Sequence, residues 1–194
     1  HIKTAAGIRD AKSSEDERLK AAAIEGALVS LDPSSGEVIA YIGGYEFSSR
    51  SQLDCVERIM RQPGSSFKPM VYAAALWNHA ITPSTVMIDE KTSFGEDYAP
   101  GNYGETFSGN IIMREALRRS VNVIAVKVLV ASGYDRLMSV IQGGLNLAAG
   151  DMERRFGQTP SLALGTYELS PMENAVLHSL LVNGGQFLIP YGIR

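Results

Sequence analysis

The sequence has few of the residues that build disulfides and metal centres. It contains one cysteine, Cys55, and three histidines, His1, His79 and His178, spread over 194 residues. A single cysteine forms neither an internal disulfide nor a cysteine-based metal site, and histidines this far apart do not indicate a His-rich centre. A phosphate-binding loop for a nucleotide is also missing. We therefore expect no metal and no other cofactor.

An excess of positive charge and a long apolar run are absent as well. The 18 Lys and Arg are outnumbered by 21 Asp and Glu, which gives a formal net charge of -3. Nucleic-acid-binding proteins usually carry a clear basic excess, so we expect no nucleic-acid partner. The longest apolar stretch, residues 123–131, contains Lys127 and is far shorter than the roughly 20 residues that span a bilayer. The 45% hydrophobic content is nevertheless sufficient for a buried core.

The two ends of the sequence suggest a piece of a longer protein. The chain begins with His1 and shows no signal peptide. An extracytoplasmic protein that has lost its targeting segment would begin in this way, and so would a fragment of a cytoplasmic protein. Residues 1–24 are charged and alanine-rich and are expected to be a linker or lead-in segment before one domain over 25–194.

After Gly26 the apolar residues recur with a period of two, which is typical of strands. They alternate over residues 27–31 and 38–42, and DPSSG at residues 32–36 lies between the two runs. Because Pro and Gly preset the dihedral angles of a turn, the pattern predicts a β-hairpin.

Helical patterns follow the hairpin. They cover residues 68–79, 113–120, 123–132 and 134–141, whereas residues 81–110 read as a loop. In a last helix Ser170 is the N-cap, Pro171 takes the first position and Glu173 completes a capping box. A hairpin followed by helices predicts an α+β fold. Since two strands alone do not make a stable sheet, we expect further polypeptide to complete it.

Residues 61–69, RQPGSSFKP, combine a turn with the start of a helix. Ser65 follows the Pro-Gly turn and is expected at the helix N-terminus, where free N–H groups favour a developing negative charge. Lys68 lies three residues later on the same face. A buried lysine loses proton affinity, and a hydroxyl beside a neutral amine is an activated nucleophile. The spacing alone also fits a plain N-cap serine and a solvated lysine.

The longer string QPGSSFKP, followed by VYAA at residues 71–74, resembles the active-site serine motif of penicillin-binding proteins. Arg61 and Gln62, which come just before Pro63, are similar to the class A, bifunctional branch of that family. The family's second motif, Ser-x-Asn, has two candidates, one at residues 108–110 and one formed by Ser120 and Asn122. We choose Ser120 and Asn122 because a helix junction holds side chains more rigidly than a loop. The REAL string before them is also similar to the family's own context.

This resemblance, which covers residues 25–194, implies a penicillin-binding/β-lactamase-like transpeptidase fold: an antiparallel sheet packed with helices, plus a mostly helical subdomain. It implies a serine D-alanyl-D-alanine transpeptidase that cross-links peptidoglycan stem peptides through an acyl-enzyme on Ser65. An amine of a second stem peptide would be the acceptor, and β-lactam antibiotics would be covalent inhibitors. Lys68 would take the serine proton, Ser120 would relay it and Asn122 would bind the substrate amide. The implied location is the extracytoplasmic face of a bacterial membrane, which the protein would contact only through an anchor outside this chain, with a glycosyltransferase domain upstream.

One motif of the family is missing. The nearest string to Lys-Thr-Gly is KTS at residues 91–93, which lacks the glycine and precedes Ser120. We expect the true motif, and with it the C-terminal strands of the domain, after Arg194. Other readings remain open: a D,D-carboxypeptidase, a β-lactamase-like hydrolase with Glu168 as its base, or a non-catalytic β-lactam sensor or wall-binding module. The residues around Glu168 are more typical of the start of a helix than of the site of a catalytic base.

Overall fold

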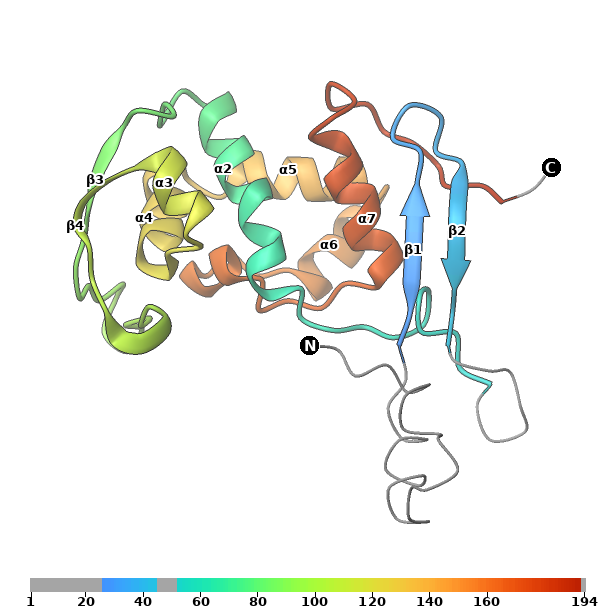
Figure 1. Ribbon diagram of the computed structural model, residues 1–194, viewed down its shortest axis with the longest axis horizontal. Helices are drawn as coiled ribbons and strands as arrows, with labels where there is room; N and C mark the ends of the chain where they lie inside the picture. The colour runs from blue at the N-terminus through green and yellow to red at the C-terminus, as the bar shows by residue number, and fades with distance from the viewer. Residues whose placement is uncertain (1–25, 45–51, 193–194) are drawn as a thin grey trace, which may run out of the picture.

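The computed structural model describes residues 26–44 and 52–192. The linker predicted over residues 1–24 lies outside the described residues. Figure 1 shows the helices gathered between two β-hairpins, one at each end of the molecule. Each hairpin is a two-stranded antiparallel sheet, and helices lie both between and after the two sheets in the chain. The predicted α+β fold is confirmed.

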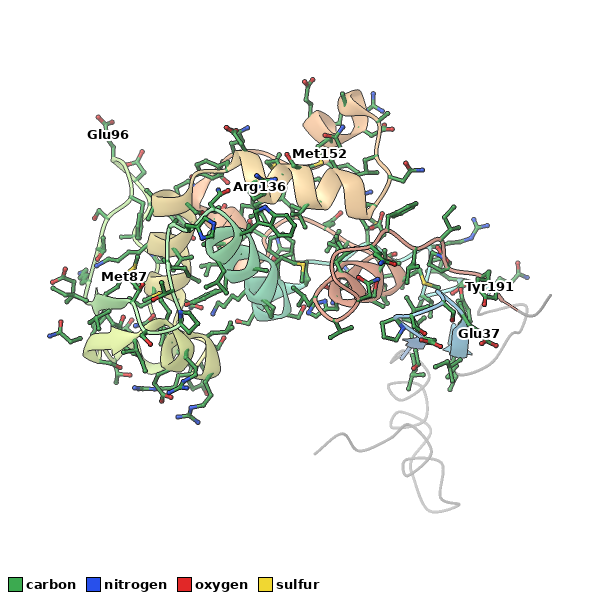
Figure 2. The ribbon with its side chains drawn as sticks, turned by 90° about the horizontal axis from the view of Figure 1, so that it is seen from above. Glu37, Met87, Glu96, Arg136, Met152 and Tyr191 are labelled. Carbon is green, nitrogen blue, oxygen red and sulfur yellow. The ribbon has the colours of Figure 1, made fainter. Side chains whose placement is uncertain are left out.

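The first hairpin has the predicted position. β1 spans Leu28–Leu31 and pairs with β2, Val38–Ile42. In the turn, the Asp32 carboxylate accepts hydrogen bonds from the backbone and the hydroxyl of Ser34, a local arrangement that short acidic side chains favour. The C-terminal segment returns to this end of the hairpin, where the backbones of Glu37 and Tyr191 form a bridge (Figure 2).

The helices begin and end close to the predicted residues. They are α2 (Lys68–Trp77), α3 (Met113–Arg118), α4 (Asn122–Ser132), α5 (Asp135–Gly144) and α7 (Pro171–Leu180). The capping box of α7 is present, with Ser170 and Glu173 exchanging hydrogen bonds between side chains and backbone. A shorter helix, α6 (Ala149–Arg155), was not predicted. Within the described residues, no helix has both the length and the apolar character needed to cross a membrane.

The main core surrounds α4, in which residues 123–126, 128 and 129 are buried while Lys127 is half-buried and Val130 is exposed. It contacts α2 on one side and the 3-10 helix η4 (Pro160–Leu164) on another. The fully buried side chains of this core include Ile124, Leu129, Leu137 and Leu162. Because α4 packs against α2, its first residues have a fixed position relative to that helix.

The second hairpin corrects the prediction that residues 81–110 form a loop. β3 (Val86–Asp89) pairs with β4 (Gly109–Ile112), and Asp89 lies opposite Gly109. Each strand has only four residues, too few to show a clear alternation, and its partner lies across a long connection. That connection contains the 3-10 helix η3 (Tyr103–Glu105). Met87, labelled in Figure 2, packs against the core.

Candidate active site

The turn that precedes α2 leaves one serine hydroxyl open. Gly64 has a left-handed φ of 57° and begins the 3-10 helix η2 (Gly64–Phe67), which runs directly into α2. Ser65 is exposed, and its hydroxyl has no hydrogen-bond partner among residues 26–44 and 52–192. The neighbouring Ser66 hydroxyl donates to the Pro63 carbonyl oxygen at 2.8 Å and accepts from Asn174 at 3.3 Å. Of the two adjacent hydroxyls, Ser65 is therefore the one free to meet a ligand.

A second segment holds this turn from behind. The Gly64 N–H donates to the Gly165 carbonyl oxygen at 3.2 Å, and Arg61 and Leu169 exchange backbone hydrogen bonds of 3.0 and 2.9 Å. Gly165 has a φ of 65°, and a Cβ at this position would lie 2.3 Å from the Gly64 carbonyl oxygen. Only glycine allows the two backbones to approach so closely.

Lys68 is buried directly behind the turn, with 1% of its surface exposed. Its Nζ donates to the Ser120 carbonyl oxygen at 2.6 Å, the Ser120 hydroxyl at 2.9 Å and Asn122 Oδ1 at 2.6 Å. Burial lowers the pKa of the Lys68 ammonium to about 8. None of the ion pairs within the described part of the chain involves Lys68, so no paired carboxylate opposes this effect.

These three contacts suit both protonation states of the amine. An ammonium donates three protons, one to each oxygen, whereas a neutral amine donates two and offers one lone pair. Of the three oxygens around Nζ, only the hydroxyl of Ser120 can donate a proton to that lone pair. Lys68 and Ser120 can therefore exchange a proton without any rearrangement of heavy atoms.

Ser120 and Asn122 are presented by the junction between α3 and α4. Ser120 adopts a left-handed φ of 56°, a conformation that costs a non-glycine residue roughly 1–2 kcal/mol and is often retained at functional sites. Asn122 is the first residue of α4, and its Nδ2 donates to the Gly101 carbonyl oxygen at 2.9 Å. Both ends of its side-chain amide are thus fixed, one by Gly101 and the other by Lys68.

The structure brings Lys68, Ser120 and Asn122 together, although 52 and 54 residues separate the last two from Lys68. Ser65 lies one turn before Lys68 on the same continuous helical segment, but its hydroxyl is not among the groups that bond Nζ. The alternative Ser-x-Asn string, residues 108–110, leads into β4 instead, and its serine N–H donates to Asp89. Within the described ranges, no cluster of His, Cys, Asp and Glu could hold a metal ion.

Comparison with known proteins identifies the family. The family model described as the penicillin binding protein transpeptidase domain matches residues 26–194. The chain belongs to the penicillin-binding protein transpeptidase family. Penicillin-binding protein 1A of Pseudomonas aeruginosa is 38% identical over 177 residues, which cover 89% of this chain and 21% of that protein. Penicillin-binding protein 1A of Neisseria gonorrhoeae is 38% identical over 84% of this chain and 20% of its own length.

A solved structure agrees with this assignment. The crystal structure of penicillin-binding protein 1A from Haemophilus influenzae has a TM-score of 0.77 and 30% sequence identity. The match covers 86% of this chain and 24% of that one. The resemblance read from the sequence and the fold that it implied are thereby confirmed. The chain spans about a fifth of the length of the curated penicillin-binding proteins that it matches.

Three residues of the candidate site were not found by sequence reasoning. Gly165 supports the serine turn, while Asn102 and Asp89 lie behind Asn122, within the region that was read as a loop. An asparagine after Pro-Gly, as at Asn102, is common in loops, and the sequence does not indicate that its side chain bonds the start of a distant helix. Glu168, considered as a base for a hydrolase, is exposed, and its carbonyl oxygen accepts from Arg155 just before α7.

The close approach of Gly165 to Gly64 leads to a prediction about stability. Gly165→Ala should lower the free energy of unfolding by about 2–4 kcal/mol, because the new Cβ needs a left-handed backbone and also overlaps Gly64. Gly184→Ala is the matched control, since Gly184 has a φ of 76° but no atom within 4 Å of the added Cβ. Thermal unfolding of both variants should show a clearly larger loss for Gly165→Ala, and equal losses would contradict the overlap.

Proposed function

We propose that this chain is the transpeptidase unit of a class A penicillin-binding protein, which cross-links peptidoglycan through an acyl-enzyme on Ser65. The observation that carries the proposal is the buried amine of Lys68, held by Ser120 and Asn122 one helical turn after an open serine hydroxyl. Family membership supports the same reaction class. As in the family, the unit would act at the extracytoplasmic face of the membrane.

In the proposed acylation, the Ser65 oxygen attacks the carbonyl of the penultimate D-alanine while its proton passes to the neutral amine of Lys68. The backbone N–H of Ser65, at the start of the helical segment, supplies one hydrogen bond to the developing oxyanion. The Ser120 hydroxyl then delivers a proton to the leaving nitrogen and is replenished by the Lys68 ammonium. D-Alanine departs, and the acyl group remains on Ser65 as an ester.

The second half-reaction reverses these proton transfers. The amine of a neighbouring stem peptide attacks the ester, loses a proton through Ser120 and Lys68, and leaves with the new amide bond while Ser65 recovers its hydrogen. The ester conserves the energy of the broken peptide bond, so the reaction needs no nucleotide. Asn122 would hold the substrate amide and keep Lys68 oriented. A β-lactam presents a reactive amide at the same place and would acylate Ser65 in the same way.

The direct test is to locate the covalent adduct. The full-length protein is incubated with penicillin, digested with trypsin and examined by mass spectrometry for the peptide that follows Arg61, which contains Ser65, Ser66 and Lys68. We expect one penicilloyl group on Ser65 that is lost slowly. No adduct, or an adduct elsewhere, would overturn the proposal, and rapid loss would instead indicate a hydrolase.

The lowered pKa of Lys68 predicts how this acylation depends on pH. Only the neutral amine can accept the serine proton, and with a pKa of about 8 a minority of the molecules carry it at neutral pH. The acylation rate constant should therefore rise about tenfold per pH unit below a pH of about 8 and level off above it. Stopped-flow measurement with a chromogenic cephalosporin checks this, and a rate constant that stays flat below neutral pH would contradict the role of Lys68.

A further inference from the structure

A buried carboxylate lies at the end of β3, behind the candidate site. Asp89 has 1% of its surface exposed. Its Oδ1 accepts from Asn102 Nδ2 at 2.7 Å and its Oδ2 accepts from the Ser108 N–H at 2.8 Å. No cation pairs with Asp89 in the described ranges. Since burying a charge is costly unless it is well hydrogen-bonded, a carboxylate at this position needs a specific reason.

Asn102 links this carboxylate to the first turn of α4. Its Oδ1 accepts from the backbone N–H groups of Asn122 at 3.0 Å and Val123 at 3.1 Å. The residue before α4, Val121, has no side-chain oxygen with which to cap the helix. Free N–H groups at a helix start need an acceptor. Asn102 therefore acts as the cap of α4, although it lies in a distant loop.

The groups around Asn102 allow only one orientation of its amide. On the Nδ2 side are two acceptors, the Asp89 carboxylate and the Thr106 carbonyl oxygen at 3.1 Å. On the Oδ1 side are two backbone donors of α4. A flipped amide would set acceptor against acceptor and donor against donor. Asp89 thus fixes the rotamer in which Asn102 can cap the helix.

The first turn of α4 carries Asn122, whose Oδ1 bonds Lys68, and the same loop supplies the Gly101 carbonyl oxygen to Asn122 Nδ2. We propose that Asp89 and Asn102 are positioning residues for acylation, an inference that rests on the function proposed above. Asp89 orients Asn102, Asn102 places the start of α4, and α4 in turn holds Asn122 against Lys68. A shift of about 1 Å in such a relay can slow catalysis by about 100-fold.

The test measures the second-order rate constant for acylation of the full-length protein by fluorescent penicillin, well below the unfolding temperature. Asn102→Ala should lower it about 30- to 100-fold. Asp89→Asn and Asn102→Asp should each lower this rate constant too. Asp89→Asn removes the acceptor for the Asn102 amide, and Asn102→Asp places two carboxylates side by side. The double variant Asp89→Asn/Asn102→Asp exchanges donor and acceptor and should recover a rate constant within about tenfold of the parent value. The loss of a donor to Thr106 keeps this recovery incomplete.

Asn183→Ala is the matched control, because it removes two side-chain hydrogen bonds to the backbone of Gln186 in a turn after α7. It should keep the parent rate constant. If the parent protein is acylated and Asn102→Ala reacts equally fast, the positioning role is wrong while the proposed function stands. A double variant no faster than the slower single variant would overturn the pairing of the two residues. A parent protein that is not acylated at all would refute the proposed function instead.

Discussion

Ser65→Ala should abolish covalent labelling of the full-length protein by fluorescent penicillin. Alanine has no oxygen to form the acyl-enzyme, and removal of a catalytic nucleophile typically costs more than about 1,000-fold in rate. Ser65 is exposed, and its hydroxyl makes no hydrogen bond within residues 26–44 and 52–192. The substitution should therefore leave the fold intact, with a change in stability within about 0.5 kcal/mol. The measurement is the labelled fraction after prolonged incubation, with thermal unfolding recorded in parallel.

Ser66→Ala is the matched control, since it removes the same atom from the next residue. The Ser66 hydroxyl bonds the Pro63 carbonyl oxygen and Asn174, so its loss loosens the turn without removing the nucleophile. We expect labelling of Ser66→Ala to slow by less than about tenfold. The opposite pattern, in which Ser65→Ala is labelled and Ser66→Ala is not, would assign the nucleophile to Ser66.

The features predicted correctly from the sequence are those that short segments determine by themselves. The turn between β1 and β2 is formed by Asp32 and its near neighbours. The capping box of α7 uses two residues three positions apart, Ser170 and Glu173. The spacing of Ser65 and Lys68 is equally local, because one continuous helical segment carries both. Such signals do not depend on the rest of the fold, and sequence reasoning can therefore read them.

The environment of Lys68 needed more than local reasoning. Its burial and lowered pKa come from packing against the α3–α4 junction, more than 50 residues away in the chain. Spacing alone also fits a plain N-cap serine and a solvated lysine. Only the resemblance to a family pointed to Ser120 and Asn122, and the structure places both against Nζ. The chemistry that we assign to them remains a proposal.

The parts that were missed are contacts between distant segments. Gly165 touches Gly64 across 101 residues, and Asn102 caps a helix that starts 20 residues later. β3 and β4 are short strands whose pairing closes a long connection. In each case the residue types are ordinary for loops, and only the packing of the whole domain decides what they meet. The support for the candidate site is thus built mainly from non-local contacts.

Lys68→Met should reduce the acylation rate constant by about 1,000-fold, within the range of about 100- to 10,000-fold that general base catalysis contributes. Methionine has an unbranched apolar side chain that can take the buried position of the Lys68 side chain, but it can neither accept the Ser65 proton nor donate to Ser120 and Asn122. The variant should also lose the rise of the rate constant below a pH of about 8, because that rise belongs to the Lys68 amine. Stopped-flow acylation over the same pH range measures both effects.

Lys127→Met provides the comparison, since its ammonium also donates to a backbone carbonyl oxygen, that of Ile88 at 2.7 Å, but makes no contact with Ser120 or Asn122. It should keep the parent rate constant within about threefold and the parent pH profile. Thermal unfolding of both variants shows whether each is folded at the assay temperature. If folded Lys68→Met still forms the Ser65 adduct at the parent rate, the serine is activated by another base, and the three hydrogen bonds of Lys68 serve only to hold the α3–α4 junction against α2.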